Sequence, residues 1–163
     1  MIELILIMET RSSNQSDYMY VKSTIDYYYQ SRTFGITKIF ATSKSQLTKQ
    51  DNKIKNACKK TSRTPVLVII ADYDYDEKLN EEIKIYCKNN SINLIWMNSD
   101  IEDVYLGEKT KRKEKEKRAI AFQISKDKLL PNLKNLSEID PLKKNKCSNI
   151  LIILDKYLKR KNM

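Results

Sequence analysis

Acidic residues follow two apolar runs of the sequence. Glu9 comes directly after residues 2–8, and Asp72 and Asp74 come directly after residues 66–71. If both runs are parallel strands that lie side by side, about 4.8 Å apart, their C-terminal ends bring these carboxylates together. Three or more carboxylates at one place repel one another unless a cation or protons intervene, and Mg²⁺ prefers such oxygen ligands. The pattern predicts a divalent-metal site.

Aspartates after a strand can also cap the helix that follows. We assign this role to Asp76, which precedes Glu77 at the expected start of a helix, where a carboxylate accepts backbone N–H groups. An EF-hand is excluded, because the position after Asp72, Asp74 and Asp76 that requires glycine is Glu77, and the position that requires a final acid is Ile83.

Two more residues are candidates for the same site. Glu102 follows the fourth apolar run and could add a metal ligand, or it could simply solvate a short helix. Arg11 lies close to Glu9 and could hold a phosphate or neutralise its acidic neighbours.

The elements that position these residues alternate along the chain. Four apolar runs with strand character are separated by segments of about 20 to 27 residues, which suit crossover helices rather than hairpins. The predicted strands are residues 2–8, 36–42, 66–71 and 92–97, and the predicted helices are residues 16–30, 45–60 and 77–89. We expect an α/β fold with a mostly parallel, four-stranded, Rossmann-like sheet flanked by helices over residues 1–107. Residues 108–163 form a basic helical extension that packs on this core, with a last helix over residues 149–161.

The first of these helices is rich in tyrosine. Tyr20, Tyr27 and Tyr28 approximate a helical stripe with Val21 and Thr24. Such a stripe could stack on nucleic-acid bases, but packing on the sheet is the simpler interpretation.

The positive charge is confined to the last third of the chain. Residues 1–107 carry equal numbers of acidic and basic side chains, so the whole net charge of +10 lies in residues 108–163. Lysine and arginine contacts to phosphates give a salt-dependent affinity for nucleic acid. The alternative is a solvated helix with its own ion pairs, since Glu114 and Glu116 interrupt the run. The candidate nucleic-acid-binding residues are Lys111, Arg112, Lys113, Lys115, Lys117 and Arg118, together with Arg11.

Composition excludes several classes of protein. The chain has no histidine, which rules out Ser-His and Cys-His catalysis and His-ligated zinc. Its two glycines cannot build a glycine-rich phosphate loop. Three widely spaced cysteines argue against a disulfide framework. No apolar run spans a bilayer and no export signal is recognised, so we expect a cytoplasmic protein without a membrane partner.

A glutamate after the first strand and a D-x-D after the third resemble the signature of the Toprim domain. The order and size of the segments over residues 2–107 look most like the small RloB-like and OLD-nuclease-related members. The resemblance implies that Asp72 and Asp74 bind Mg²⁺ or Mn²⁺ and that Glu9 acts as general acid/base or as a further ligand. It also implies a metal-dependent nuclease or phosphotransfer enzyme acting on nucleic acid in bacterial phage defence. Many family members have glycine where this chain has Thr10.

Two other functions stay open. The same fold could be a non-catalytic module that regulates or neutralises a protein partner. A receiver-like phosphorylation domain is disfavoured, because it needs paired acids after the first strand, where this chain has the single Glu9, and a lysine near the last strand.

Overall fold

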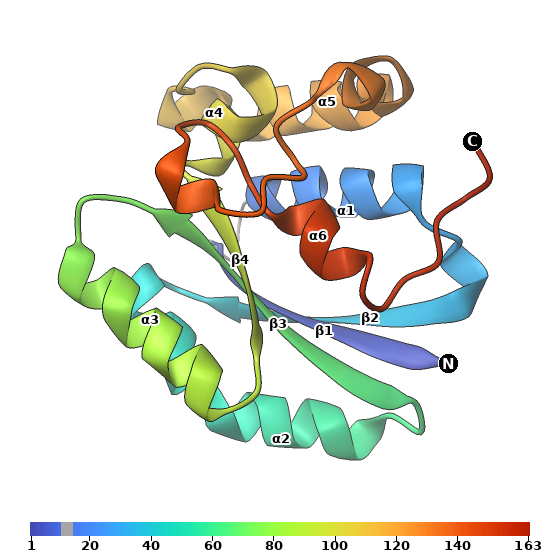
Figure 1. Ribbon diagram of the computed structural model, residues 1–163, viewed down its shortest axis with the longest axis vertical. Helices are drawn as coiled ribbons and strands as arrows, with labels where there is room; N and C mark the ends of the chain where they lie inside the picture. Colours follow the sequence, from blue (N-terminus) through green and yellow to red (C-terminus); the bar gives the residue numbers. More distant parts are fainter. Residues whose placement is uncertain (11–14) are drawn as a thin grey trace.

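The computed structural model describes residues 1–10 and 15–163 of the chain. Within these residues one sheet contains four strands, all parallel, in the order β2-β1-β3-β4 (Figure 1). The strands are β1 Ile2–Glu9, β2 Phe34–Ala41, β3 Thr64–Tyr73 and β4 Asn93–Asn98. The predicted α/β fold is confirmed, and β1 and β3 are neighbours, which is the condition that the candidate site requires.

The central strands are covered on both faces, as their continuous apolar sequences predict. Residues 3–8 of β1 are all buried. Leu4 and Leu6 pack into the core on one face of the sheet, whereas Ile5 and Ile7 pack into the core on the other. This alternation is the period-two pattern of a strand between two helical layers.

Helices form a layer on each face of the sheet (Figure 1). One face carries α1 Ser16–Tyr28, α4 Ile101–Leu106, α5 Lys115–Leu129 and α6 Ile150–Leu154. The other face carries the 3₁₀ helix η2 Lys44–Lys49, α2 Asp51–Lys60 and α3 Glu77–Asn89. Shorter 3₁₀ turns are η1 Ser31–Thr33, η3 Arg112–Glu114, η4 Leu130–Asn132 and η5 Pro141–Lys143. Among the helices described, none is long and apolar enough to cross a membrane.

The tyrosine-rich α1 packs on the sheet as predicted, and α5 packs on α1. Tyr20 is fully buried, and its ring centroid lies 5.1 Å from those of Phe122 and Tyr105. Residues after 107 therefore share the core with the sheet rather than forming a separate one.

The outer edge of β4 is paired by the C-terminal extension. The backbone N–H of Asn98 donates to the carbonyl oxygen of Cys147 (2.9 Å), and Met97 forms an antiparallel bridge with Ser148. The side chain of Asn149 accepts from the N–H of Trp96 at 2.9 Å. These contacts satisfy backbone groups that an open strand edge would leave unpaired.

The last helix is shorter than the sequence predicts. It ends at Leu154, and the chain then runs back along α1, where Arg160 pairs with Tyr29 across an antiparallel bridge. Asp155 accepts two hydrogen bonds from the Arg160 guanidinium, at 2.6 and 2.8 Å, and one from the Tyr29 hydroxyl at 2.9 Å. The prediction of a helix over residues 149–161 is wrong because these tertiary contacts outweigh its amphipathic pattern.

Candidate acidic site

Glu9 and Asp72 lie at the C-terminal ends of the two central strands. Glu9 is the last residue of β1, and Asp72 is followed by Tyr73 at the end of β3. The helix after β1 covers one face of the sheet and the helix after β3 covers the other, so the strand connections diverge here. Ligands of open α/β sheets bind at this kind of divergence.

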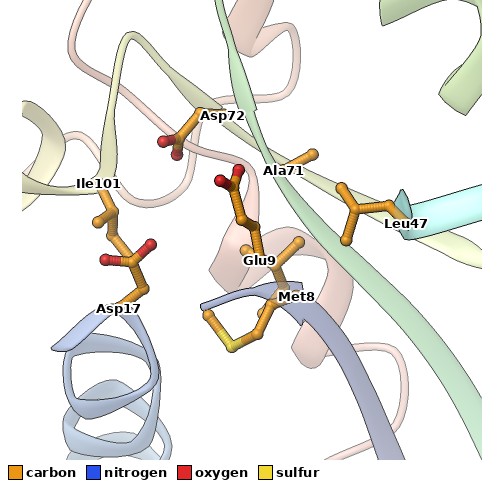
Figure 2. Close-up of a pocket in the computed structure, with 8 residues that line it drawn as sticks. Met8, Glu9, Asp17, Leu47, Ala71, Asp72 and Ile101 are labelled. Atoms are coloured by element: carbon orange, nitrogen blue, oxygen red, sulfur yellow. The ribbon is translucent and has the colours of Figure 1, made fainter. Parts of the chain in front are cut away.

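A small pocket opens at this edge of the sheet. Its acidic lining is Glu9, Asp17 and Asp72, and its apolar lining is Met8, Leu47, Ile70, Ala71 and Ile101. Figure 2 shows the carboxyl groups of Glu9 and Asp72 side by side, with Asp17 facing the same space from the start of α1. The enclosed space is about that of a single water molecule. The pocket thus suits an ion or a water rather than a nucleotide base.

Two carboxyl groups at this edge, those of Asp17 and Asp72, resist ionisation. The pKa of Asp72 is raised well above its ordinary value, first by burial and then by repulsion from Asp17, Asp100, Glu102 and Glu9. The pKa of Asp17 is raised to about 7 by burial and by the charges of Glu102 and Glu9. We call these five residues the acidic cluster. Near neutral pH the cluster favours a bound proton or a bound cation.

Glu102 connects this cluster to the basic segment of the chain. Its side chain is 1% exposed, and its Oε1 lies 3.2 Å from Nζ of Lys115, the first residue of α5. Burial raises the pKa of Glu102, and the charge of Lys115 partly offsets that rise. The sequence suggested Glu102 as a metal ligand; in the structure it has a lysine partner, and the ligand role stays a prediction.

Asp74 is not among the residues that line the pocket. Its Oδ1 accepts from Lys44 Nζ at 2.8 Å and from the backbone N–H of Asp76 at 3.0 Å. Lys44 also donates to Asn80, which in turn donates to the Asp74 carbonyl oxygen at 2.9 Å. Burial alone would raise the pKa of Asp74, but these hydrogen bonds and the lysine charge hold it below its ordinary value. The structure does not bring Asp74 to Glu9 and Asp72.

The remaining predicted residues have varied surroundings. Asp76 caps α3, because its Oδ1 accepts from the N–H of Leu79 at 3.0 Å, as predicted. Arg118 pairs with Glu108 at 2.5 Å, as expected for a solvated helix. The other basic side chains of this run, Lys111, Arg112, Lys113 and Lys117, are exposed. Arg11 lies outside the described residues.

Asp17 is the site residue that the sequence did not reveal. It lies in the first turn of α1, where an acidic residue is ordinarily explained by the positive end of the helix. Only its position after the strand that ends in Glu9 could have suggested that it faces the same pocket.

The comparisons with known proteins add no name to this geometry. No family model, no curated protein and no solved structure matches the chain. Because a fold of this class serves many functions, the function has to be inferred from the site itself.

The acidic pocket offers carboxylate oxygens, which are the type of ligand that Mg²⁺ and Mn²⁺ prefer. Among the described residues, no three acidic or cysteine side chains form a group that could hold a metal by themselves. Mg²⁺, however, is usually held by one or two carboxylates and completes its shell with waters and substrate phosphate oxygens. Glu9 and Asp72 supply such a pair, and Asp17 lies beside them. The residues fit a partly hydrated divalent ion.

Proposed function

We propose that this protein is a metal-dependent nuclease or phosphotransfer enzyme that acts on nucleic acid. The observation that carries the proposal is the pocket of Glu9, Asp17 and Asp72 at the divergence of the central strands. Acidic groups with raised pKa values in a pocket are typical of functional sites, since they destabilise the fold unless a ligand neutralises them.

The basic segment begins beside this pocket, which supports a phosphate-bearing substrate. Lys115 is near enough to Asp17 for its charge to lower the pKa of that carboxyl group. The exposed lysines around it can contact the backbone of a nucleic acid without reading its sequence. Acidic groups for a cation and basic groups for phosphates then lie side by side, as phosphoryl transfer needs.

Each acidic residue has a distinct part in this proposal. Asp72 and Glu9 would hold the divalent ion, and Asp17 would hold a water at the same pocket. A bound ion of this kind polarises the scissile phosphate and neutralises its developing charge. Glu9 has an exposed side chain, so its carboxylate can also accept a proton from an attacking water. By its resemblance to the RloB-like Toprim proteins, we place this activity in bacterial phage defence.

Cleavage assays test the proposal. The full chain is incubated with supercoiled plasmid and with RNA, in Mg²⁺, in Mn²⁺ and in EDTA. We expect cleavage that requires a divalent ion and is abolished by Asp72→Asn and by Glu9→Gln. Asp76→Asn is the matched control, because asparagine is an equally good helix cap and Asp76 is not among the residues that line the pocket. An unaltered protein that cleaves neither substrate in either ion contradicts the proposal.

A non-catalytic module is the second candidate. It is favoured by the internal partners of two predicted ligands, since Asp74 pairs with Lys44 and Glu102 pairs with Lys115. In this case the chain would regulate a protein partner. The two candidates differ in metal binding, because a module with a degenerate site gains no thermal stability from Mn²⁺.

A further inference from the structure

One ion pair joins the acidic cluster to the basic segment. Glu102 lies in the first turn of α4, and Lys115 is the first residue of α5. The Glu102 side chain is 1% exposed, whereas the Lys115 side chain is 35% exposed. The ammonium group therefore reaches both the buried carboxylate and the solvent.

Two buried polar groups near this ion pair have few hydrogen-bond partners among the described residues. Glu102 Oε1 lies 3.2 Å from the Lys115 ammonium and has no other hydrogen-bond partner among the described residues. Among the described residues, the buried hydroxyl of Tyr20 also has no hydrogen-bond partner. Burial raises its pKa, and the nearby charges of Glu102 and Asp17 raise it further. A buried ion pair whose members are poorly satisfied contributes little to stability. The lysine is thus held by charge rather than by a rigid network.

We infer that Lys115 is the cation that receives a substrate phosphate at the acidic cluster, and that Glu102 holds it there until the phosphate binds. The inference rests on the proposed function, which supplies the phosphate ligand. An ammonium group has three donors and keeps its charge, so it can turn from a carboxylate to a phosphate oxygen and exchange one anionic partner for another.

The inference singles out one lysine of a basic run. Among the described residues of this run, Lys115 is the one whose ion-pair partner belongs to the acidic cluster. Burial would lower the pKa of Lys115, but Glu102, Asp17 and Asp100 raise it above its ordinary value, so the group stays charged. In the absence of a bound metal ion, the charge of Lys115 offsets the repulsion that ionised Asp17 and Asp72 exert on an approaching phosphate.

The experiment measures binding of a fluorescein-labelled single-stranded oligonucleotide, as DNA and as RNA, by fluorescence anisotropy in EDTA. Lys115→Ala is compared with Lys117→Ala, an exposed lysine of the same helix without an ion pair among the described residues. We expect Lys115→Ala to weaken binding about tenfold and Lys117→Ala to weaken it less than about threefold. Equal losses for the two variants, or no binding by the unaltered protein, would overturn the inference.

A double-mutant cycle tests the role of Glu102. Lys115→Ala alone leaves the buried Glu102 carboxylate without its cation, which can destabilise the fold. The double variant Lys115→Ala with Glu102→Gln removes both charges, so it shows whether the weaker binding of Lys115→Ala is caused by misfolding. If Glu102 competes with phosphate for the lysine, Glu102→Gln tightens oligonucleotide binding about threefold when Lys115 is present. The same substitution hardly changes binding when it is made in the Lys115→Ala variant. Equal tightening in both backgrounds means simple charge repulsion and contradicts the exchange.

The outcome is separable from that of the proposed function. Binding in EDTA does not depend on cleavage, so a Lys115-specific loss of binding would stand even if no substrate were cleaved. Conversely, cleavage that needs Asp72, together with equal binding losses for Lys115→Ala and Lys117→Ala, would leave the enzyme proposal intact and remove only this inference.

Discussion

Asp72 and Asp74 are separated by one residue, yet their carboxyl groups are in opposite electrostatic surroundings. Asp72 faces Glu9 and Asp17 across the pocket, and its pKa is raised. Asp74 accepts hydrogen bonds from Lys44 and from the Asp76 backbone, and its pKa is lowered. Ionisation of Asp74 therefore stabilises the folded chain, whereas ionisation of Asp72 opposes folding. Asp72, whose ionisation is unfavourable without a cation, is therefore the carboxyl group that is available to bind one.

The largest expected difference between the two is in catalysis. We expect Asp72→Asn to lower cleavage at least about 100-fold, because it removes a carboxylate from the pocket. Asp74→Asn should lower it less than about threefold, since the amide oxygen can still accept from Lys44. Initial rates on plasmid in Mn²⁺ measure both. Similar losses for the two variants would show that Asp74 moves into the site with substrate.

The next effect is on stability and its dependence on pH. A carboxyl group with a raised pKa in the folded state contributes stability that is lost as the pH rises through that value. The free energy of unfolding of the unaltered chain should thus fall between about pH 4 and about pH 7 through Asp17, and Asp72, whose pKa is also raised, adds a fall in the same direction as the pH rises. Asp72→Asn should therefore stabilise the chain more at about pH 8 than at about pH 4. Urea unfolding at both pH values checks this, and a pH-independent difference would contradict it.

Metal binding gives a smaller difference. Mn²⁺ at about ten times its Kd should stabilise the folded chain by about 1.4 kcal/mol and raise its Tm by about 3 to 6 °C. Asp72→Asn should remove this shift and Asp74→Asn should keep it, which thermal unfolding with and without Mn²⁺ measures. A shift that survives in Asp72→Asn would place the ion elsewhere.

The smallest effect is the loss of the Lys44 partner. Asp74→Ala should destabilise the chain by about 1 kcal/mol at neutral pH, a modest value because about half of the Asp74 side chain is exposed. The stabilisation by its charge is complete above the pKa of an unfolded aspartate and is lost as the pH falls through the lowered pKa of Asp74 in the folded chain, so the difference should shrink in acid. Urea unfolding of Asp74→Ala and of Lys78→Ala, an exposed lysine of α3, makes the comparison.

The sequence contains enough information for the sheet and for part of the site. Continuous aliphatic runs predict buried central strands, and the adjacency of β1 and β3 follows from the usual topology of such sheets. The cap at Asp76 follows from its place before a helix. The contact between Lys44 and Asp74 joins side chains 30 positions apart, and no periodicity encodes it. The sequence does not indicate Asp17 either, because an aspartate in the first turn of a helix is already explained by the positive end of that helix.

The pairing of the β4 edge by residues 147–149 bears on how the chain can be divided. A fragment that stops at residue 107 would keep all four strands but would leave that edge without its partner and the apolar side of α1 uncovered. Such a fragment is expected to self-associate through its open strand. The same exposure arises transiently during synthesis, because residues 147–149 are made after all four strands of the sheet.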